Sequence, residues 1–322
     1  MSFQITEAFV KQYSSNVFHL SQQKGSRLRG AVRSETQVGK TAFYDRIGLV
    51  AAQLRTSRHG DTPQLDTPHS RRKVDLFDYE WADLVDDQDK IRMLMDPTSQ
   101  YAKAAAWALG RSMDIKILDA LGGEVIPGEE GNGTPIPLPL TRKVAAAIST
   151  EGAGASTGGQ LTVLELRRIK KMFDKEDVDE SMQKYIAVNS YMLESLLGDE
   201  KITSSDYAAV KALVNGQIDT FMGFKFIRTE LLKRASVDFL YDKDSGEYDA
   251  GASGHTIAAA DSRVGYAWAQ DGLLLATGQD ITGEISRRDD KSYATQVYAK
   301  MSIGAVRMEE EKVVEFLVKE IP

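Results

Sequence analysis

The sequence contains no cysteine among its 322 residues. This absence excludes disulfide bonds, thiolate metal sites and a cysteine nucleophile. Stability under harsh conditions must therefore come from packing or from association with other chains. A reducing compartment is consistent with this composition.

Long apolar runs are also absent. No segment approaches the roughly 20 apolar residues that a membrane span needs, and the start, MSFQITEAFVKQYSS, lacks the apolar core of a signal peptide. We expect a soluble protein made in the cytoplasm, with no membrane partner. Its 42% hydrophobic and 27% charged residues are normal for a chain that buries a core.

Catalytic fingerprints are missing as well, including G-x-S-x-G, H-E-x-x-H, EF-hand and Rossmann glycine patterns. One partial match remains, because Gly39-Lys40-Thr41 resembles the end of a phosphate-binding P-loop. That loop needs a second glycine five residues earlier, where Ser34 stands, and a preceding buried strand, where residues 22–33 are largely polar and basic. We therefore interpret the triplet as part of a loop or extended arm.

Histidine is scarce, with four residues in the chain. His59 and His69 lie near Asp61 and Asp66, but their spacing fits no standard metal motif. The Asp-Thr-Pro units are typical of turns and account for the aspartates without an ion. We expect no metal, no cofactor and no catalytic residue.

Charge is plentiful but unevenly distributed. Residues 1–73 hold 12 Lys and Arg against 5 Asp and Glu, a balance of +7, whereas the remaining 28 against 42 give −14, and the two sum to −7. A basic segment of one copy could lie on the acidic surface of the next, or the asymmetry could be a solvated fluctuation. The net negative charge of residues 74–322 opposes tight wrapping by DNA, which is itself negatively charged.

The boundary between the two charge signs supplies candidate contact residues. A positive block directly precedes a negative one, and these charges could pair within the chain or, on a projecting loop, with another copy. The candidate subunit-interface residues are Arg55, Arg58, Arg71, Arg72, Lys73, Asp83, Asp86, Asp87 and Asp89.

The apolar periodicity of the first half predicts three helices and one long irregular segment. Apolar residues recur every three or four positions over 5–20, whereas 22–69 shows no helical stripe and predicts a disordered tail, a projecting arm or a hairpin. A shorter helix is expected from about Trp81 to Met95 and a long one over about 97–121. The long helix has a face of mostly small residues: Tyr101, Ala104, Ala105, Ala108, Ser112 and Ile115.

The second half predicts a mixture of helices and strands. Thr162 and Glu165 form a capping-box pattern before a helix. A strand (185–188), two helices (190–197 and 206–214) and a strand pair in IDTFMGFKFIRTE follow. The last third alternates like strands and ends in a hairpin or a final strand. The predicted fold class is α+β.

Several segments, taken together, resemble the major capsid proteins of tailed bacteriophages, whose fold is shared with encapsulins. They are FVKQYSSNVFHLSQQKGSRLRGAV, RHGDTPQLDTPHSRRKVDLFDYEWADLVD, DPTSQYAKAAAWALGRSMDIKILDALGG and SSDYAAVKALVNGQIDTFMGFKFIRTELL. The resemblance extends over nearly the whole chain.

The resemblance implies a domain layout. It gives an N-terminal arm (1–37), an extended loop lying over a neighbouring subunit (38–78), and a peripheral domain with the long spine helix (79–159). An axial domain (160–250) follows, and C-terminal strands (251–322) return to the peripheral domain. Gly39 then serves the bend from arm to loop.

The resemblance also implies a structural function. Pentamers and hexamers would close into an icosahedral head around double-stranded DNA, without catalysis. They would assemble in the host cytoplasm, with scaffolding, portal or decoration proteins as further partners. Some relatives crosslink a loop lysine to a neighbour, but nothing here marks a partner for Lys40, so noncovalent assembly is expected. An encapsulin-like compartment shell is the alternative.

Overall fold

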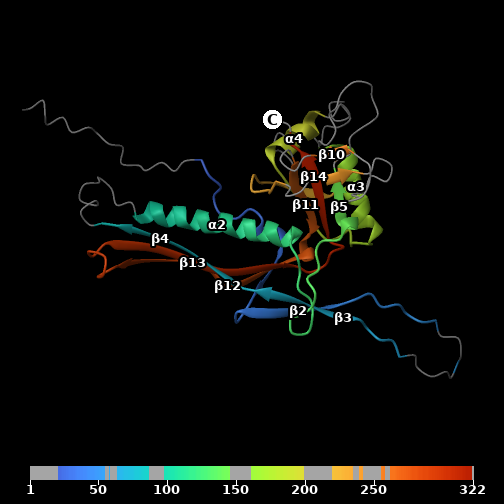
Figure 1. The fold of residues 1–322 in the computed structure, drawn as a ribbon, viewed down its shortest axis with the longest axis horizontal. Helices are drawn as coiled ribbons and strands as arrows, with labels where there is room; N and C mark the ends of the chain where they lie inside the picture. The colour runs from blue at the N-terminus through green and yellow to red at the C-terminus, as the bar shows by residue number, and fades with distance from the viewer. Residues whose placement is uncertain are drawn as a thin grey trace, which may run out of the picture. The chain divides into compact units, whose positions relative to one another are not determined.

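The computed structural model describes most of the chain, in separate segments. These are residues 21–54, 58, 64–86, 98–145, 161–198, 220–234, 239–241, 255–257 and 262–320. The chain forms two compact units (Figure 1). Unit 1 comprises Met1–Ser26, Phe77–Met113 and Gln279–Ile303, and unit 2 comprises Arg27–Leu76, Asp114–Gly278 and Gly304–Pro322. The mixture of helices and strands confirms the α+β class.

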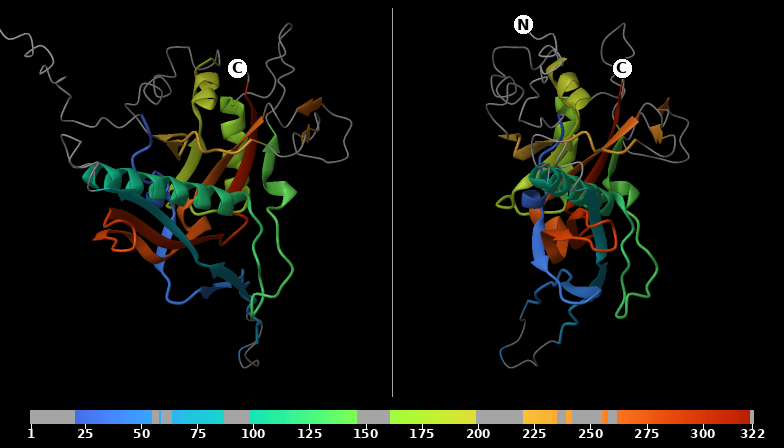
Figure 2. Two further views of the ribbon diagram at one scale, coloured as in Figure 1. Left: turned by 60° about the vertical axis from the view of Figure 1, so that its left-hand side comes forward. Right: turned by 90° about the vertical axis from the view of Figure 1, so that its left-hand side faces the viewer.

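Unit 1 is built from a helix lying along a twisted sheet (Figures 1 and 2). Strand β4 (Phe77–Val85) pairs with β13 (Thr295–Arg307), from Phe77 opposite Ile303 to Val85 opposite Thr295. The same sheet contains β12 (Leu273–Arg287) and β1 (Arg33–Thr36), in the order β1-β12-β13-β4. Alternate residues of β13 are buried and the others point away, so the sheet has one apolar and one polar face.

The long helix expected over 97–121 is present as α2 (Thr98–Gly122). Its buried stripe recurs every four residues: Ala105, Leu109, Met113, Ile117 and Leu121. The predicted small-residue face is only partly correct, because Ala105 is buried whereas Ile115 is 41% exposed. The helix packs within this chain through the buried stripe that includes Leu109, Met113 and Ile117, and this stripe lies beside the predicted face.

The predicted helix from Trp81 to Met95 is wrong over its described part. Residues 77–85 form strand β4, and residues 87–97 lie outside the described residues. The sequence FDYEWADLV places aromatic residues at every second position, with acidic residues between them. This period of two matches a strand, and the prediction of a helix overlooked it.

Unit 2 contains a six-stranded sheet in the order β5-β14-β11-β6-β8-β7. Its strands are β5 (Lys143–Ala145), β14 (Val313–Lys319), β11 (Ser262–Ala269), β6 (Lys184–Val188), β8 (Phe224–Arg228) and β7 (Thr220–Phe221). Helices α3 (Val163–Lys175) and α4 (Ser190–Gly198) accompany it. The expected strand at 185–188, the helix at 190–197 and the strand pair are confirmed. A further two-stranded pair joins β9 (Phe239–Tyr241) to β10 (His255–Ile257).

Two expectations about capping and the chain end need correction. Thr162 is the N-cap of α3, but its side chain makes no capping bond; instead its carbonyl accepts the N–H of Glu165 and Leu166. The last two strands do not form a hairpin, because β13 and β14 belong to different sheets; the alternative, a final strand, is confirmed by β14. Segment 251–322 therefore contributes strands to both larger sheets, and the domain boundaries stay a prediction.

Residues 28–32 pack into the core of unit 2 through the buried Leu28, Ala31 and Val32. The carboxylate of the fully buried Asp114 accepts the backbone N–H groups of Arg27 and Leu28 at 3.0 and 3.1 Å. The indole N–H of buried Trp268 donates to the Ala31 carbonyl at 2.8 Å. The strand that follows, β1, runs parallel to β12. This part of the predicted arm is therefore anchored in its own chain, while 1–20 lie outside the described residues.

The close approach of α2 to residues 25–26 gives a test of packing in unit 1. A Cβ at Gly110 would lie 2.6 Å from the backbone of Gly25. We expect Gly110→Ala to destabilise the chain by about 1–3 kcal/mol, against the roughly 1 kcal/mol that alanine gains in helix propensity. Urea unfolding of unassembled chain checks this. Gly30→Ala is the control, because no atom lies within 4 Å of its Cβ; equal midpoints for both variants would contradict the packing.

Candidate subunit interface

A two-stranded hairpin occupies the region where the sequence predicted an arm or hairpin. Strand β2 (Thr41–Ile47) pairs antiparallel with β3 (His69–Asp75), from Thr41 opposite Asp75 to Ile47 opposite His69. At its base the Thr41 hydroxyl donates to Asp75 at 2.7 Å, and the Leu76 N–H donates to the Lys40 carbonyl at 2.9 Å.

The Gly39-Lys40-Thr41 triplet builds this hairpin base. Gly39 has φ of +90°, a conformation that glycine adopts without strain. Thr41 then begins a strand, whereas a phosphate-binding loop would open into a helix. The glycine therefore turns the chain into the hairpin, as expected.

A loop of the same unit braces the inner part of the hairpin. The Lys73 N–H donates to the Ile126 carbonyl at 3.2 Å, and Arg72 forms a bridge with Pro127. Gly131, with φ of +67°, packs against the side chains of Phe43 and Lys73 with no room for a Cβ. The two strands continue beyond this brace (Figure 1), so the outer hairpin has a fixed base.

The hairpin and the residues beside it carry large apolar side chains in water. Besides Phe43 of β2 (39% exposed), six of them lie between residues 38 and 65: Val38 (94% exposed), Ile47 (67%), Leu49 (101%), Val50 (52%), Leu54 (89%) and Leu65 (41%). Side chains scattered singly over a surface need no explanation, but a concentration of this kind marks an interaction surface. We call these six the apolar loop residues.

The predicted basic contact residues fall into different environments. Arg55 lies outside the described residues, and Arg58 is exposed. Arg71 of β3 donates to Asp45 of β2 at 2.6 Å and to the Glu129 carbonyl at 3.1 Å. Lys73 pairs with Asp75 at 3.1 Å. Arg71 and Lys73 thus have partners in their own chain while remaining partly accessible.

Arg72 does not lie on the surface. Its side chain is 1% exposed, and it donates to both carboxylate oxygens of Glu310, at 2.8 and 3.0 Å. Burial lowers the pKa of this guanidinium, and the Glu310 carboxylate opposes that shift. The structure therefore assigns Arg72 to the interior of the chain, which is a correction to its predicted place among exposed contact residues.

The predicted acidic residues lie in unit 1. Asp83 and Asp86 are exposed at the end of β4, and the Asp83 carboxylate accepts the Leu84 N–H at 2.8 Å. Asp87 and Asp89 lie outside the described residues. Within unit 2, the basic residues of β3 pair with Asp45, Glu310 and Asp75.

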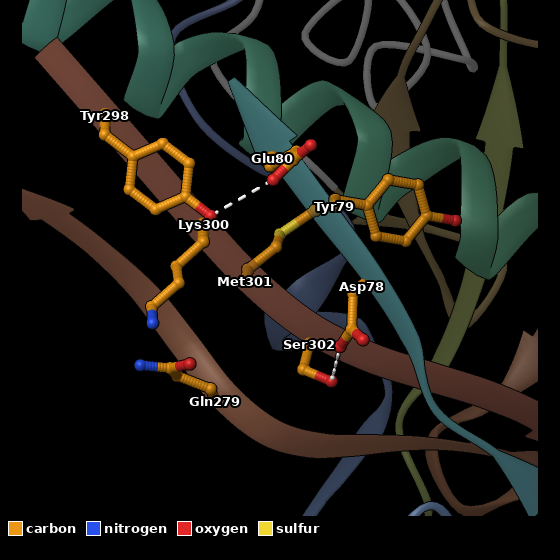
Figure 3. A pocket seen from close by; sticks show the side chains of 8 residues that line it. All are labelled: Asp78, Tyr79, Glu80, Gln279, Tyr298, Lys300, Met301 and Ser302. Carbon is orange, nitrogen blue, oxygen red and sulfur yellow. Dashed lines mark hydrogen bonds between the residues drawn. The ribbon is translucent and has the colours of Figure 1, made fainter. Parts of the chain in front are cut away.

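The polar face of the unit 1 sheet contains an open hollow of about 530 Å³ (Figure 3). Asp78 and Glu80 project into it from β4, opposite Ser302 and Lys300 of β13. The Ser302 hydroxyl donates to Asp78 at 2.6 Å, and the Tyr298 hydroxyl donates to Glu80 at 3.1 Å.

The polar side chains that line this hollow hydrogen-bond one another in pairs. The pKa of Tyr298 is raised, first by desolvation and then by its bond to the Glu80 carboxylate, so the phenol stays protonated. Within the described ranges, no group of three or more histidines, aspartates and glutamates could hold a metal ion. No helix in that part of the chain is both long and apolar enough to span a bilayer.

The exposed Asp45–Arg71 pair gives a test of local charge. The bond from Arg71 lowers the pKa of the Asp45 carboxyl below its ordinary value of 3.8. We expect Arg71→Gln to return the titration midpoint of Asp45 to its ordinary range, as followed by carbon NMR of labelled aspartate. An unchanged midpoint would show that the pair does not form in solution.

A braced hairpin that holds apolar side chains in solvent presents a surface suited to contact with another chain. The phage capsid protein family model matches residues 5–320, and the chain belongs to this family. It is a structural major capsid protein of the phage head.

Solved capsids share the fold at low sequence identity. The capsid of cyanophage P-SCSP1u is 14% identical, with a TM-score of 0.71, covering 98% of this chain and 95% of that one. The capsid of cyanophage Pam1 is 15% identical (TM-score 0.66, 98% and 97% covered). The acidic stable capsid of Helicobacter pylori bacteriophage KHP30 is 11% identical (TM-score 0.66, 99% and 98% covered). No curated protein matches the sequence.

Proposed function

We propose that this chain assembles through pentamers and hexamers into a closed icosahedral head that encloses double-stranded DNA. The observation that carries the proposal is the set of apolar loop residues, exposed on a hairpin whose base is fixed by its own chain. In the proposed head, a neighbouring copy covers these side chains.

The energetics favour assembly through many modest contacts. Fully burying one leucine-sized side chain stabilises by about 1.5–3 kcal/mol. Several such side chains on each copy, repeated around a closed lattice, make the shell far more stable than any single contact. The closed symmetry also explains why one kind of hairpin suffices for every neighbour.

Charge complements this apolar contact in the proposal. The accessible basic residues Arg58, Arg71 and Lys73 lie in or beside the hairpin, and the acidic Asp83 and Asp86 lie on unit 1. A basic hairpin on an acidic neighbour steers the correct pairing. The balance of −14 over residues 74–322 suits a container for DNA, since a strongly positive wall would trap the polymer.

The proposal includes no catalysed reaction and no cofactor. Assembly takes place in the host cytoplasm, and scaffolding, portal and decoration proteins are the partners that a head of this kind would use. The contacts between copies are noncovalent.

The proposal is tested with particles purified from phage-producing cells. Negative-stain microscopy should show closed heads in which this chain is the main protein, and treatment with nuclease should leave protected DNA. Closed shells that hold a protein cargo and no protected DNA would instead support an encapsulin-like compartment, which the family match does not favour.

A further inference from the structure

One carboxylate, that of Glu310, joins both strands of the hairpin to the body of unit 2. Arg72 of β3 donates to both of its oxygens, at 2.8 and 3.0 Å. Arg46 of β2 donates to it at 3.2 Å and also to the neighbouring Met308 carbonyl at 2.9 Å. Glu310 lies in the turn between β13 and β14, more than 230 residues along the chain from Arg72.

The same carboxylate also faces Arg307, at the end of β13. Arg307 is fully buried, and its Nε lies 3.9 Å from Glu310. Its Nη1 donates to the carbonyls of Leu121 and Gly123, at 2.9 and 2.8 Å, where α2 ends. Glu310 therefore links the hairpin strands to the end of the long helix, through hydrogen bonds to Arg46 and Arg72 and a longer ion pair with the buried Arg307.

The balance of charge makes this carboxylate hard to replace. Three guanidinium groups surround it, and those of Arg72 and Arg307 are almost completely buried. Burial lowers the pKa of both buried arginines, while Glu310 opposes the shift in each. Arg72 forms its two side-chain hydrogen bonds to Glu310, whereas Arg307 donates to backbone carbonyls and meets Glu310 through charge at 3.9 Å.

The remaining backbone links between the two strands and the bracing loop act on β3, whereas β2 adds apolar packing of Phe43 against Gly131 and of Tyr44 against the core. The brace consists of the Lys73 bond to Ile126 and the bridge of Arg72 with Pro127. The bonds of Arg46 reach the β13–β14 turn from β2. A two-stranded hairpin held on one strand can pivot about that strand, whereas one held on both strands has a defined direction.

We propose that Glu310 is a positioning residue that fixes the direction in which the β2–β3 hairpin leaves the body. This inference rests on the proposed shell function. In such a shell, the direction of the hairpin decides where the apolar loop residues meet a neighbouring copy. Glu310 itself touches no neighbour in this role. Its effect passes through Arg46 and Arg72.

The absence of cysteine allows a direct measurement of this direction. Spin labels on Leu49→Cys, in the loop beyond β2, and on Glu124→Cys, directly after α2, report one intrachain distance; both sites are exposed. Double electron–electron resonance is recorded on labelled full-length chain that is diluted into unlabelled chain. Glu310 is then replaced by Gln, which is nearly the same size but uncharged, or by Asp, which keeps the charge. Arg46→Gln removes the β2 link to Met308 and Glu310, together with the bond of Arg46 to Ser70 across the hairpin, and keeps the buried Arg72–Glu310 pair.

We expect one narrow distance distribution in the unmodified chain and in the exposed-pair control Asp45→Asn. Glu310→Gln and Arg46→Gln should each widen the distance distribution at least twofold. Glu310→Asp, which keeps the charge, should leave the distribution largely as narrow as in the unmodified chain. A role in stability alone would shift the unfolding midpoint and leave the distribution of the folded chain unchanged. A folded Arg46→Gln chain with the distribution of the unmodified protein would overturn the inference. If the distribution widens as expected but unmodified chain never forms shells, the positioning role stands and the proposed function fails.

Discussion

Leu49→Ser combined with Leu54→Ser is expected to abolish shell formation while leaving the chain folded. Both side chains are almost fully exposed, at 101% and 89%, so the folded chain loses no contact. Burying two leucines against a neighbour contributes about 3–6 kcal/mol for each copy. At about 1.4 kcal/mol for each factor of ten, the concentration needed for assembly should rise at least 100-fold.

The measurement is sedimentation of purified protein over a range of concentrations, with circular dichroism to confirm folding. Leu164→Ser is a matched control, because Leu164 is also an exposed leucine, at 43%, but lies on α3 rather than on the hairpin. The control should assemble at the same concentration as the unmodified chain. Normal shells from the double variant would show that the apolar loop residues do not form the contact.

Arg72→Glu is expected to destabilise the chain itself by about 3–5 kcal/mol, because breaking a buried ion pair leaves an uncompensated charge. The new carboxylate would also face Glu310, within the buried pair that Arg72 now forms at 2.8 Å. Most domains have only 5–15 kcal/mol to lose, so much of the protein should be unfolded or insoluble. The measurement is the urea midpoint of unassembled chain.

Arg71→Glu is the matched comparison on the same strand. Arg71 forms an exposed pair with Asp45, and exposed pairs contribute little to stability. This variant should stay folded with a midpoint near that of the unmodified chain, and it should assemble poorly if Arg71 contacts an acidic neighbour. Equal midpoints for the two variants would contradict the buried position of Arg72.

Patterns of short range predicted much of the fold. Signals for a helix start and a helix end predicted α2 to within about one residue at each end, and the segment IDTFMGFKFIRTE predicted the β7–β8 pair. These signals succeed because helix and turn geometry depends on neighbours a few positions apart. The order of the parts supplied the rest through the family resemblance.

Other features depend on contacts that no local pattern encodes. Arg71, Arg72 and Lys73 are three consecutive cations in the sequence, yet only the middle one is buried, because alternate residues of a strand point to opposite sides. Its partner is Glu310, and the sequence offers no way to choose that residue among 47 acidic ones. The candidate interface was accordingly predicted from charges that are partly satisfied within the chain.

A short apolar run in the sequence does mark the apolar loop residues. The run from Ile47 to Ala52 is apolar but lies in a segment without helical or strand-like periodicity, so nothing local could cover it. An apolar run with no partner in its own chain predicts a partner in another. In β4, by contrast, the alternation of aromatic and acidic residues was visible and was misread as a helix.

The central claim is that copies of this chain cover one another's exposed hairpins in a closed shell. Cryo-electron microscopy of the assembled protein tests it most directly, because the map shows what lies against Leu49 and Leu54. The account predicts closed particles in which both side chains are buried by an adjacent copy. A chain that stays monomeric at high concentration, or a shell in which both leucines face solvent, would contradict it.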